Sequence, residues 1–183
     1  MPALEELPDD VRARIEAVSE RTGFVPNVFL ALARRPAEFR AFVAYHDALM
    51  DKETPGLGKA EREMIVVATS AANDCTYCVV AHGAILRIRA KDPLVADQLA
   101  TNHRQADITA RQRAMLDFAL RVAVEPATVE DVHLDELREH GFDVDDVWDI
   151  GAIAALFALS NRVAHLTALR PNPEFHLLGR VPR

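Results

Sequence analysis

The stretch EREMIVVATSAANDCTYCVVAHG, residues 61–83, contains both cysteines of the chain and predicts how its centre folds. Residues 64–72 are apolar on nearly every side, which is typical of a helix inside a protein rather than on its surface. Asn73 and Asp74 then interrupt the pattern, because both residue types favour helix caps and turns. The stretch therefore predicts two helices that meet near Asp74.

The remaining sequence is rich in helix signals and has almost no strand signals. No segment alternates polar and apolar residues between the turn residues that bound strands. Pro26 and Asn27 open an apolar segment that ends before Pro36, and residues 36–50 carry apolar side chains at helical spacing. Residues 51–58 contain proline and glycine and predict a loop.

Capping residues predict the helix boundaries in the second half of the chain. Thr109 and Gln112 have the spacing of a capping box, and glycine is the common residue just after a helix end. The predicted boundaries are a helix from Thr109 to Pro126, one capped by Thr128 and closed by Gly141, and one from Asp143 with Asp146 to Pro171. The chain is therefore predicted to be all-α, with about seven or eight helices.

Two short segments resemble one another. VVAHGAIL at residues 79–86 and RVAHLTAL at residues 162–169 align without gaps. One interpretation is an internal helical repeat whose second copy lacks the cysteines; the other is chance, since alanine, valine and leucine are common in this chain.

Composition predicts one domain and excludes several classes of partner. A chain of 183 residues, half of them hydrophobic, supports one sizeable core, so we expect a single domain with residues 1–25 as an N-terminal arm and 171–183 as a tail. A net charge of −7 argues against nucleic acid. The acidic start lacks an apolar signal segment, and the longest apolar run, residues 150–159, is short of the roughly 20 residues that span a membrane. We expect a cytoplasmic protein with no membrane partner.

The two cysteines and a histidine share one helix face. Cys75, Cys78 and His82 stand at positions i, i+3 and i+7, and residues three and four apart are neighbours on a helix. A disulfide between the two thiols would close a tiny loop and stabilise the fold little, because disulfides act mainly by restricting long loops. In a reducing compartment the pair is more typical of catalysis or metal binding.

The residues leave the attacking sulfur and the role of Glu63 open. A cap at Asn73 or Asp74 would put Cys75 in the first helical turn, where the helix dipole favours a thiolate. Proximity to a base instead favours Cys78, because His82 lies one turn beyond it. Glu63 reaches the site if two helices meet near Asp74; from spacing alone an ordinary surface carboxylate is favoured.

Three kinds of site fit the cysteine pair to different degrees. Structural zinc prefers four ligands, and no second C-x-x-C or H-x-x-x-H pair is present. A thioredoxin-like site needs a βαβ context, which the sequence lacks. A helical thiol peroxidase or disulfide reductase fits the dithiol, the adjacent base and the all-α pattern together, and we expect neither a metal nor another cofactor.

With these residues in view, the sequence resembles the alkylhydroperoxidase D-like family within the carboxymuconolactone decarboxylase superfamily, and in particular its peroxidase-related branch. The resemblance is carried by Glu63 followed by Cys75, Cys78 and His82, and by the flanking segments GFVPNVFLALARRP and SNRVAHLTALRPNPEF. It implies an all-helical fold that forms homo-oligomers.

The resemblance also implies the chemistry. Hydroperoxide would be reduced by Cys78, Cys75 would resolve the sulfenic acid to a disulfide, and Glu63 with His82 would relay protons. A dithiol or small thiol would then reduce the disulfide. The alternatives are a disulfide reductase or redox relay using the same dithiol, and a zinc-binding or oligomeric interaction protein. This chain departs from some members at Tyr77, where they carry a histidine.

Several further residues receive weaker interpretations. Tyr77 either donates a hydrogen bond in the site or is an exposed aromatic residue. Asn161 and Arg162 either support the pocket or an interface or belong to a helix end, which is favoured over the others. Trp148 is assigned to the core or a subunit interface. The remaining histidines outside the repeat-like segments are assigned to the surface or to packing: His46, His103, His133, His140 and His176.

Overall fold

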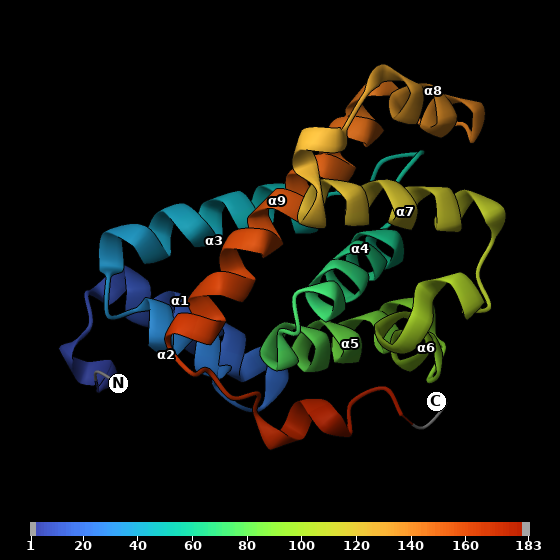
Figure 1. Cartoon of the computed structure of the whole chain (residues 1–183). Helices are drawn as coiled ribbons and strands as arrows, with labels where there is room; N and C mark the ends of the chain where they lie inside the picture. Colours follow the sequence, from blue (N-terminus) through green and yellow to red (C-terminus); the bar gives the residue numbers. More distant parts are fainter. Residues whose placement is uncertain (1–2, 181–183) are drawn as a thin grey trace.

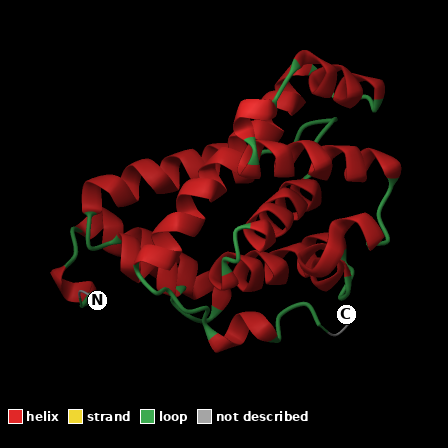
Figure 2. Cartoon of the chain, viewed as in Figure 1, coloured by secondary structure: helices red, strands yellow, loops and turns green. Residues whose placement is uncertain are grey.

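The computed structural model describes residues 3–180 and is built from helices, with no strand in that range (Figures 1 and 2). The all-α prediction is confirmed. The nine α-helices of the described residues are α1 (Asp9–Thr22), α2 (Asn27–Leu32), α3 (Pro36–Met50), α4 (Lys59–Ala72), α5 (Thr76–Ala90), α6 (Val95–Asn102), α7 (Ala110–Val124), α8 (Asp131–Glu139) and α9 (Val144–Leu166). Four short 3₁₀ segments, Leu4–Glu6, His103–Gln105, Pro126–Thr128 and Pro173–His176, lie between or beside them.

Helix α4 lies at the centre of the molecule, as its apolar sequence predicts. It packs against α5, α6, α7 and α9 (Figure 1). Every residue from 62 to 70 is buried, so the helix is surrounded by protein over most of its length. The residues that α4 carries are therefore held in fixed positions by neighbours on several sides.

The chain reverses direction between α4 and α5, as Asn73 and Asp74 predict. Asp74 adopts a left-handed backbone conformation with φ of 53°, and the Cys75 N–H donates to the Ser70 carbonyl at 2.9 Å. This bond closes a turn of the Schellman type at the end of α4. One detail differs from expectation: Cys75 is the N-cap residue of α5, whereas we expected it inside the first turn.

Most predicted boundaries agree with the structure, and two do not. Thr109 caps α7 through a capping box with Gln112, and Gly141 has φ of 83° just beyond α8. Thr128 does not cap α8, because its hydroxyl donates to the Glu125 carbonyl and completes a 3₁₀ turn; α8 begins two residues after Val129. Helix α9 ends at Leu166, before Pro171, and Ala168 just beyond this end takes a left-handed conformation.

Helix α9 is long and apolar enough, by length and composition alone, to cross a membrane. Half of its most apolar window is buried inside the protein, where it packs against α4 and α7, and core helices pass the same test. Of the two interpretations of Trp148, the core is wrong, because this side chain is 72% exposed near the start of α9; the subunit interface stays a prediction.

The N-terminal helices form a second, smaller apolar cluster. Its buried members are Leu7, Val11, Ile15, Ala33 and Phe39, while one large cluster unites the remaining helices. Residues of the predicted N-terminal arm therefore pack on α2 and α3, and they form one wall of the cavity described below.

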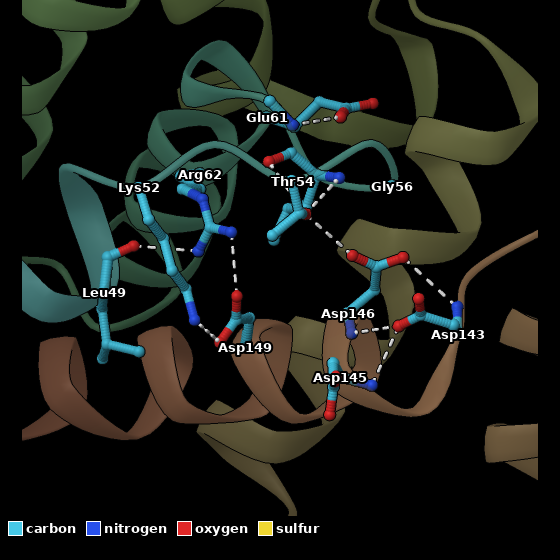
Figure 3. A network of polar contacts seen from close by, with 12 residues as sticks. Leu49, Lys52, Thr54, Gly56, Glu61, Arg62, Asp143, Asp145, Asp146 and Asp149 are labelled. Carbon is cyan, nitrogen blue, oxygen red and sulfur yellow. Dashed lines mark hydrogen bonds and ion pairs between the residues drawn. The ribbon is translucent and has the colours of Figure 1, made fainter.

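A buried ion pair joins α3, α4 and α9 (Figure 3). The Arg62 side chain is fully buried; its guanidinium donates to the Leu49 carbonyl at 2.8 Å and to Asp149 Oδ2 at 2.8 Å. Lys52 Nζ reaches the other Asp149 oxygen at 2.6 Å. The charge of Asp149 is thus shared by two cations, which ties the end of α3 and the start of α9 to α4.

We predict that Asp149→Ala lowers the free energy of unfolding by about 3–5 kcal/mol, because Arg62 would then be buried without a counter-charge. Urea denaturation measures this quantity. The matched control is Asp135→Ala, which removes an exposed pair with Arg138 and should change the value by less than about 1 kcal/mol. Equal effects of the two substitutions would show that the buried pair has no special importance.

Candidate active site

The structure brings the four predicted site residues together from two helices. Glu63 lies on α4, and His82 lies on α5, which runs back alongside it. The His82 ring donates from Nδ1 to Glu63 Oε2 at 2.7 Å, and Arg89 Nη1 lies 2.9 Å from Glu63 Oε1. Because Glu63 is only 2% exposed, the interpretation as a surface carboxylate is wrong.

The two cysteines are free, buried thiols that influence each other strongly. A hydrogen bond from Cys78 lowers the pKa of Cys75 to about 6, against the opposing effect of burial. The same interaction, together with burial, raises the pKa of Cys78 far above its ordinary range. The pair therefore keeps one proton near neutral pH, with the negative charge on Cys75.

Two residues of α9 complete the surroundings of the thiols. The sequence did not indicate Ser160, and for Asn161 it favoured a helix end over a place at the pocket. Ser160 Oγ lies 3.8 Å from Cys78 Sγ. Asn161 is fully buried, donates to Ser70 Oγ at 3.0 Å and lowers the pKa of both thiols by hydrogen bonding. The assignment of Asn161 to a helix end is wrong; the signal was a polar Ser-Asn pair inside an apolar helix.

Tyr77 is a structural residue rather than an exposed aromatic. Its side chain is 4% exposed, and its hydroxyl oxygen accepts the Val28 N–H at 3.2 Å. Burial raises the pKa of Tyr77 well above its ordinary value, so the phenol keeps its proton. The hydroxyl thus holds the start of α2 beside α5.

A cavity of about 300 Å³ opens beside the dithiol. Among the described residues, its wall contains Cys78 and His82 but not Cys75. Helices α1, α2, α3 and α5 supply most of the lining, which is largely apolar and includes Val28, Phe29, Phe42, Val43, Ile85 and Phe175. An apolar pocket with few polar groups is typical of a site for a small organic molecule.

His46 also lies on the wall of this cavity, a position that the sequence did not indicate, while its ring stacks on Phe42 and so agrees with the packing assignment. Its ring centroid is 6.3 Å from that of His82, and both rings lie against the edge or face of Phe157. His165 is placed differently, since its Nε2 lies 3.0 Å from the Asn73 carbonyl oxygen at an exposed helix end. The internal repeat stays a prediction.

Within residues 3–180, no group of three or more histidine, cysteine, aspartate or glutamate side chains is arranged to hold a metal ion. Arg162 is exposed and donates to the Ala158 carbonyl of its own helix.

Comparison with known proteins identifies the family. Residues 36–125 match the carboxymuconolactone decarboxylase family. The chain is similar to a crystal structure described as an alkylhydroperoxidase AhpD core, an uncharacterized peroxidase-related protein from Ralstonia eutropha JMP134, with 64% identity, a TM-score of 0.97, and coverage of 100% of this chain and 95% of that one.

Two further structures extend the comparison. An uncharacterized peroxidase-related protein from Silicibacter sp. TM1040 is 43% identical, with a TM-score of 0.91 over 96% of this chain and 91% of that one. The debrominase Bmp8 is 21% identical, with a TM-score of 0.77 over 93% and 90% of the respective chains, and shares the fold. No curated protein matches the chain.

We predict that the reduced protein titrates one thiolate with a midpoint near pH 6, the value to which the pKa of Cys75 is lowered. Above that pH one thiolate is present; below it both thiols are protonated. Absorbance at 240 nm, where thiolates absorb, measures the titration. Cys78→Ala removes the hydrogen-bond donor and should move the midpoint upward, toward or beyond the ordinary value of about 8.5. An unchanged midpoint in this variant would contradict the interaction between the two sulfurs.

Proposed function

Because the chain belongs to the carboxymuconolactone decarboxylase family, with the peroxidase-related AhpD-like fold, we propose that it reduces hydroperoxides through its Cys75–Cys78 dithiol. Cys78 is the peroxidatic thiol in this proposal, and Cys75 resolves the oxidised intermediate. Glu63 and His82 relay protons between the site and its surroundings.

The observation that carries the proposal is the position of Cys78 on the cavity wall. A hydroperoxide in the cavity meets Cys78 and His82, whereas Cys75 is not among the described residues of the lining. The lowered pKa of Cys75 favours this thiol as the resting thiolate, whereas access from the cavity favours Cys78 as the attacking sulfur. Access decides the first attack, because a sulfur that the substrate cannot reach does not react with it.

The shared proton reconciles access with acidity. Moving the proton from Cys78 to Cys75 along their hydrogen bond transfers the charge to Cys78 without removing a second proton from a buried pair. The Cys78 thiolate then attacks the outer oxygen of the hydroperoxide. A sulfur–oxygen bond forms, the oxygen–oxygen bond breaks, and an alkoxide leaves that must take up one proton.

The second step consumes the proton that Cys75 received. The Cys75 sulfur attacks the sulfenic sulfur of Cys78, the disulfide bond forms, and the hydroxide leaves as water with that proton. A neighbouring thiol of this kind keeps the sulfenic acid on the reversible part of the oxidation ladder. An external dithiol or small thiol then reduces the disulfide by exchange. We also propose a cytoplasmic setting, since the cytoplasm supplies such reductants.

We predict that Cys78→Ser stops hydroperoxide consumption, whereas Cys75→Ser still consumes one equivalent and leaves a sulfenic acid that dimedone traps. The reason is that Cys78 by itself attacks the peroxide in the first step, whereas Cys75 is needed only for disulfide formation in the second. Peroxide assays, thiol counts and mass spectrometry of the trapped protein measure the outcome. Reversed phenotypes would exchange the two roles, and unreacted thiols in the wild-type protein would refute the peroxidase itself.

We further propose that two copies of the chain pair through the outer face of α9. Trp148, Leu159 and Leu166 are 72%, 53% and 85% exposed along one stripe of this helix, at spacings that keep them on one face. Gly151 lies on the same stripe, and a Cβ added there would meet nothing within 4 Å. Glycine inside a helix lowers its stability by about 0.5–1 kcal/mol relative to alanine, and close approach of another backbone would explain why glycine stands at position 151.

A second α9 in antiparallel orientation is the occupant that the charges favour. Around a two-fold axis at Ala155, the acidic start of one helix at Asp145 faces the basic end of the other at His165. Trp148 then lies opposite Arg162 of the second copy, a pairing suited to a cation–π contact, and Leu159 faces the open space at Gly151. The two ends of α9 complement each other only in this orientation.

We predict that Ala155→Glu dissociates this dimer, because it places two carboxylates at the axis. Ala155 is exposed in the single chain, so folding should be retained. Light scattering during size-exclusion chromatography measures the mass. Val132→Glu, at a 62% exposed position on α8, is the matched control and should leave the mass unchanged. A wild-type monomer, or a dimer that tolerates Ala155→Glu, would refute the α9 interface.

A further inference from the structure

A second histidine is held at the cavity by its own carboxylate and arginine. His46 Nδ1 lies 3.3 Å from Asp47 Oδ1 on α3. Arg14 on α1 donates through Nη2 to both carboxylate oxygens of Asp47, at 2.9 and 2.7 Å. Since the paired Asp47 is an acceptor, His46 donates from Nδ1 and presents Nε2 as its other proton-carrying atom.

This arrangement repeats the one around His82 in a different part of the chain. There too an imidazole Nδ1 donates to a carboxylate, Glu63, that is paired with an arginine, Arg89. The two rings are 6.3 Å apart, and both contact Phe157. A histidine oriented by a carboxylate is the arrangement expected of a proton-transfer residue, because the carboxylate fixes the tautomer and the ring position.

The environment of His46 suits it to give up a proton. Burial, and then the electrostatic influence of His82, lower its pKa, while Asp47 and Glu63 act in the opposite direction. Arg14 and Arg21 also line the cavity and are the cations near this wall. A lowered pKa makes the imidazolium a stronger acid and also a smaller share of the protein at pH 7, so each turnover requires the ring to take up a proton from solvent first. The His46 side chain is 31% exposed and that of His82 is 13%, so His46 is the ring that solvent reloads more easily.

The direction of attack requires a donor opposite the sulfur. When a thiolate displaces an alkoxide from a peroxide, the leaving oxygen lies on the far side of the attacked oxygen from the sulfur. Cys78 reaches the cavity from α5, whereas His46 reaches it from α3, a separate wall of the same cavity. His82 shares the helix of the attacking sulfur and lies one turn beyond it.

We propose that His46 is a catalytic proton donor: it protonates the alkoxide that leaves when Cys78 attacks a hydroperoxide, with Asp47 and Arg14 as its positioning residues. This role rests on the proposed function. The thiol pair does not supply this proton, because its own proton moves to Cys75 and leaves later with the hydroxide. His46 therefore transfers one proton per turnover from solvent to the leaving oxygen, and sulfur supplies the two electrons that break the oxygen–oxygen bond.

The test compares two oxidants that differ in their need for a proton. Reduced wild-type protein and His46→Gln are mixed with tert-butyl hydroperoxide, whose alkoxide must be protonated, and with peroxyacetic acid, whose acetate leaves as a stable anion. The rate of thiol loss in a single turnover is measured at pH 7. We expect His46→Gln to slow the alkyl hydroperoxide reaction by about 100-fold, a typical contribution of general acid catalysis, and to leave the peroxyacetic acid reaction near the wild-type rate.

His140→Gln, a substitution at the C-cap of α8 and outside the cavity lining, is the matched control and should react with both oxidants as the wild type does. If His46→Gln slows both oxidants equally, or neither, the donor role is overturned while the peroxidase proposal stands. If the wild-type thiols react with neither oxidant, the proposed function is overturned and the His46 role with it.

Discussion

The reversal of the chain at Asp74 is the constraint on which the site depends. A continuous helix from α4 into α5 would separate Glu63 from Cys75 by about 18 Å along the axis, at 1.5 Å per residue. The left-handed Asp74 instead folds α5 back along α4 and brings Glu63 to His82. The same turn makes Cys75 the N-cap of α5 and leaves Cys78 one turn inside it.

Burial then determines how the site can hold charge. The carboxylate of Glu63 is almost fully enclosed, and it is tolerated there because His82 and Arg89 both contact it. The two thiols face the same restriction and respond by keeping one proton between them. The two sulfurs therefore differ: Cys75 carries the resting negative charge, and Cys78 lines the cavity.

Capping chemistry predicted the fold well, because caps act over three or four residues of sequence. Thr109 with Gln112 and Asp143 with Asp146 begin helices where expected. Thr128 was mistaken for a cap because Glu125 offers it a carbonyl, a competition that the sequence pattern does not rank. The places of Asn161 and His46 in the site could not be read from the sequence for another reason: Ser70 and His82, which they meet there, lie more than 30 residues away on other helices, and no local pattern marks such contacts.

The sequence by itself determined the stripe of Cys75, Cys78 and His82, since the spacing of side chains along one helix follows from its 3.6-residue turn. It also determined where α4 had to stop. The tertiary structure decided which groups meet that stripe: Glu63 of α4, which the sequence indicated only through the family resemblance, Asn161 of α9, and His46 of α3, whose ring lies 6.3 Å from that of His82. These contacts depend on how whole helices pack, because burial of apolar surface selects the arrangement and the polar residues are carried with it.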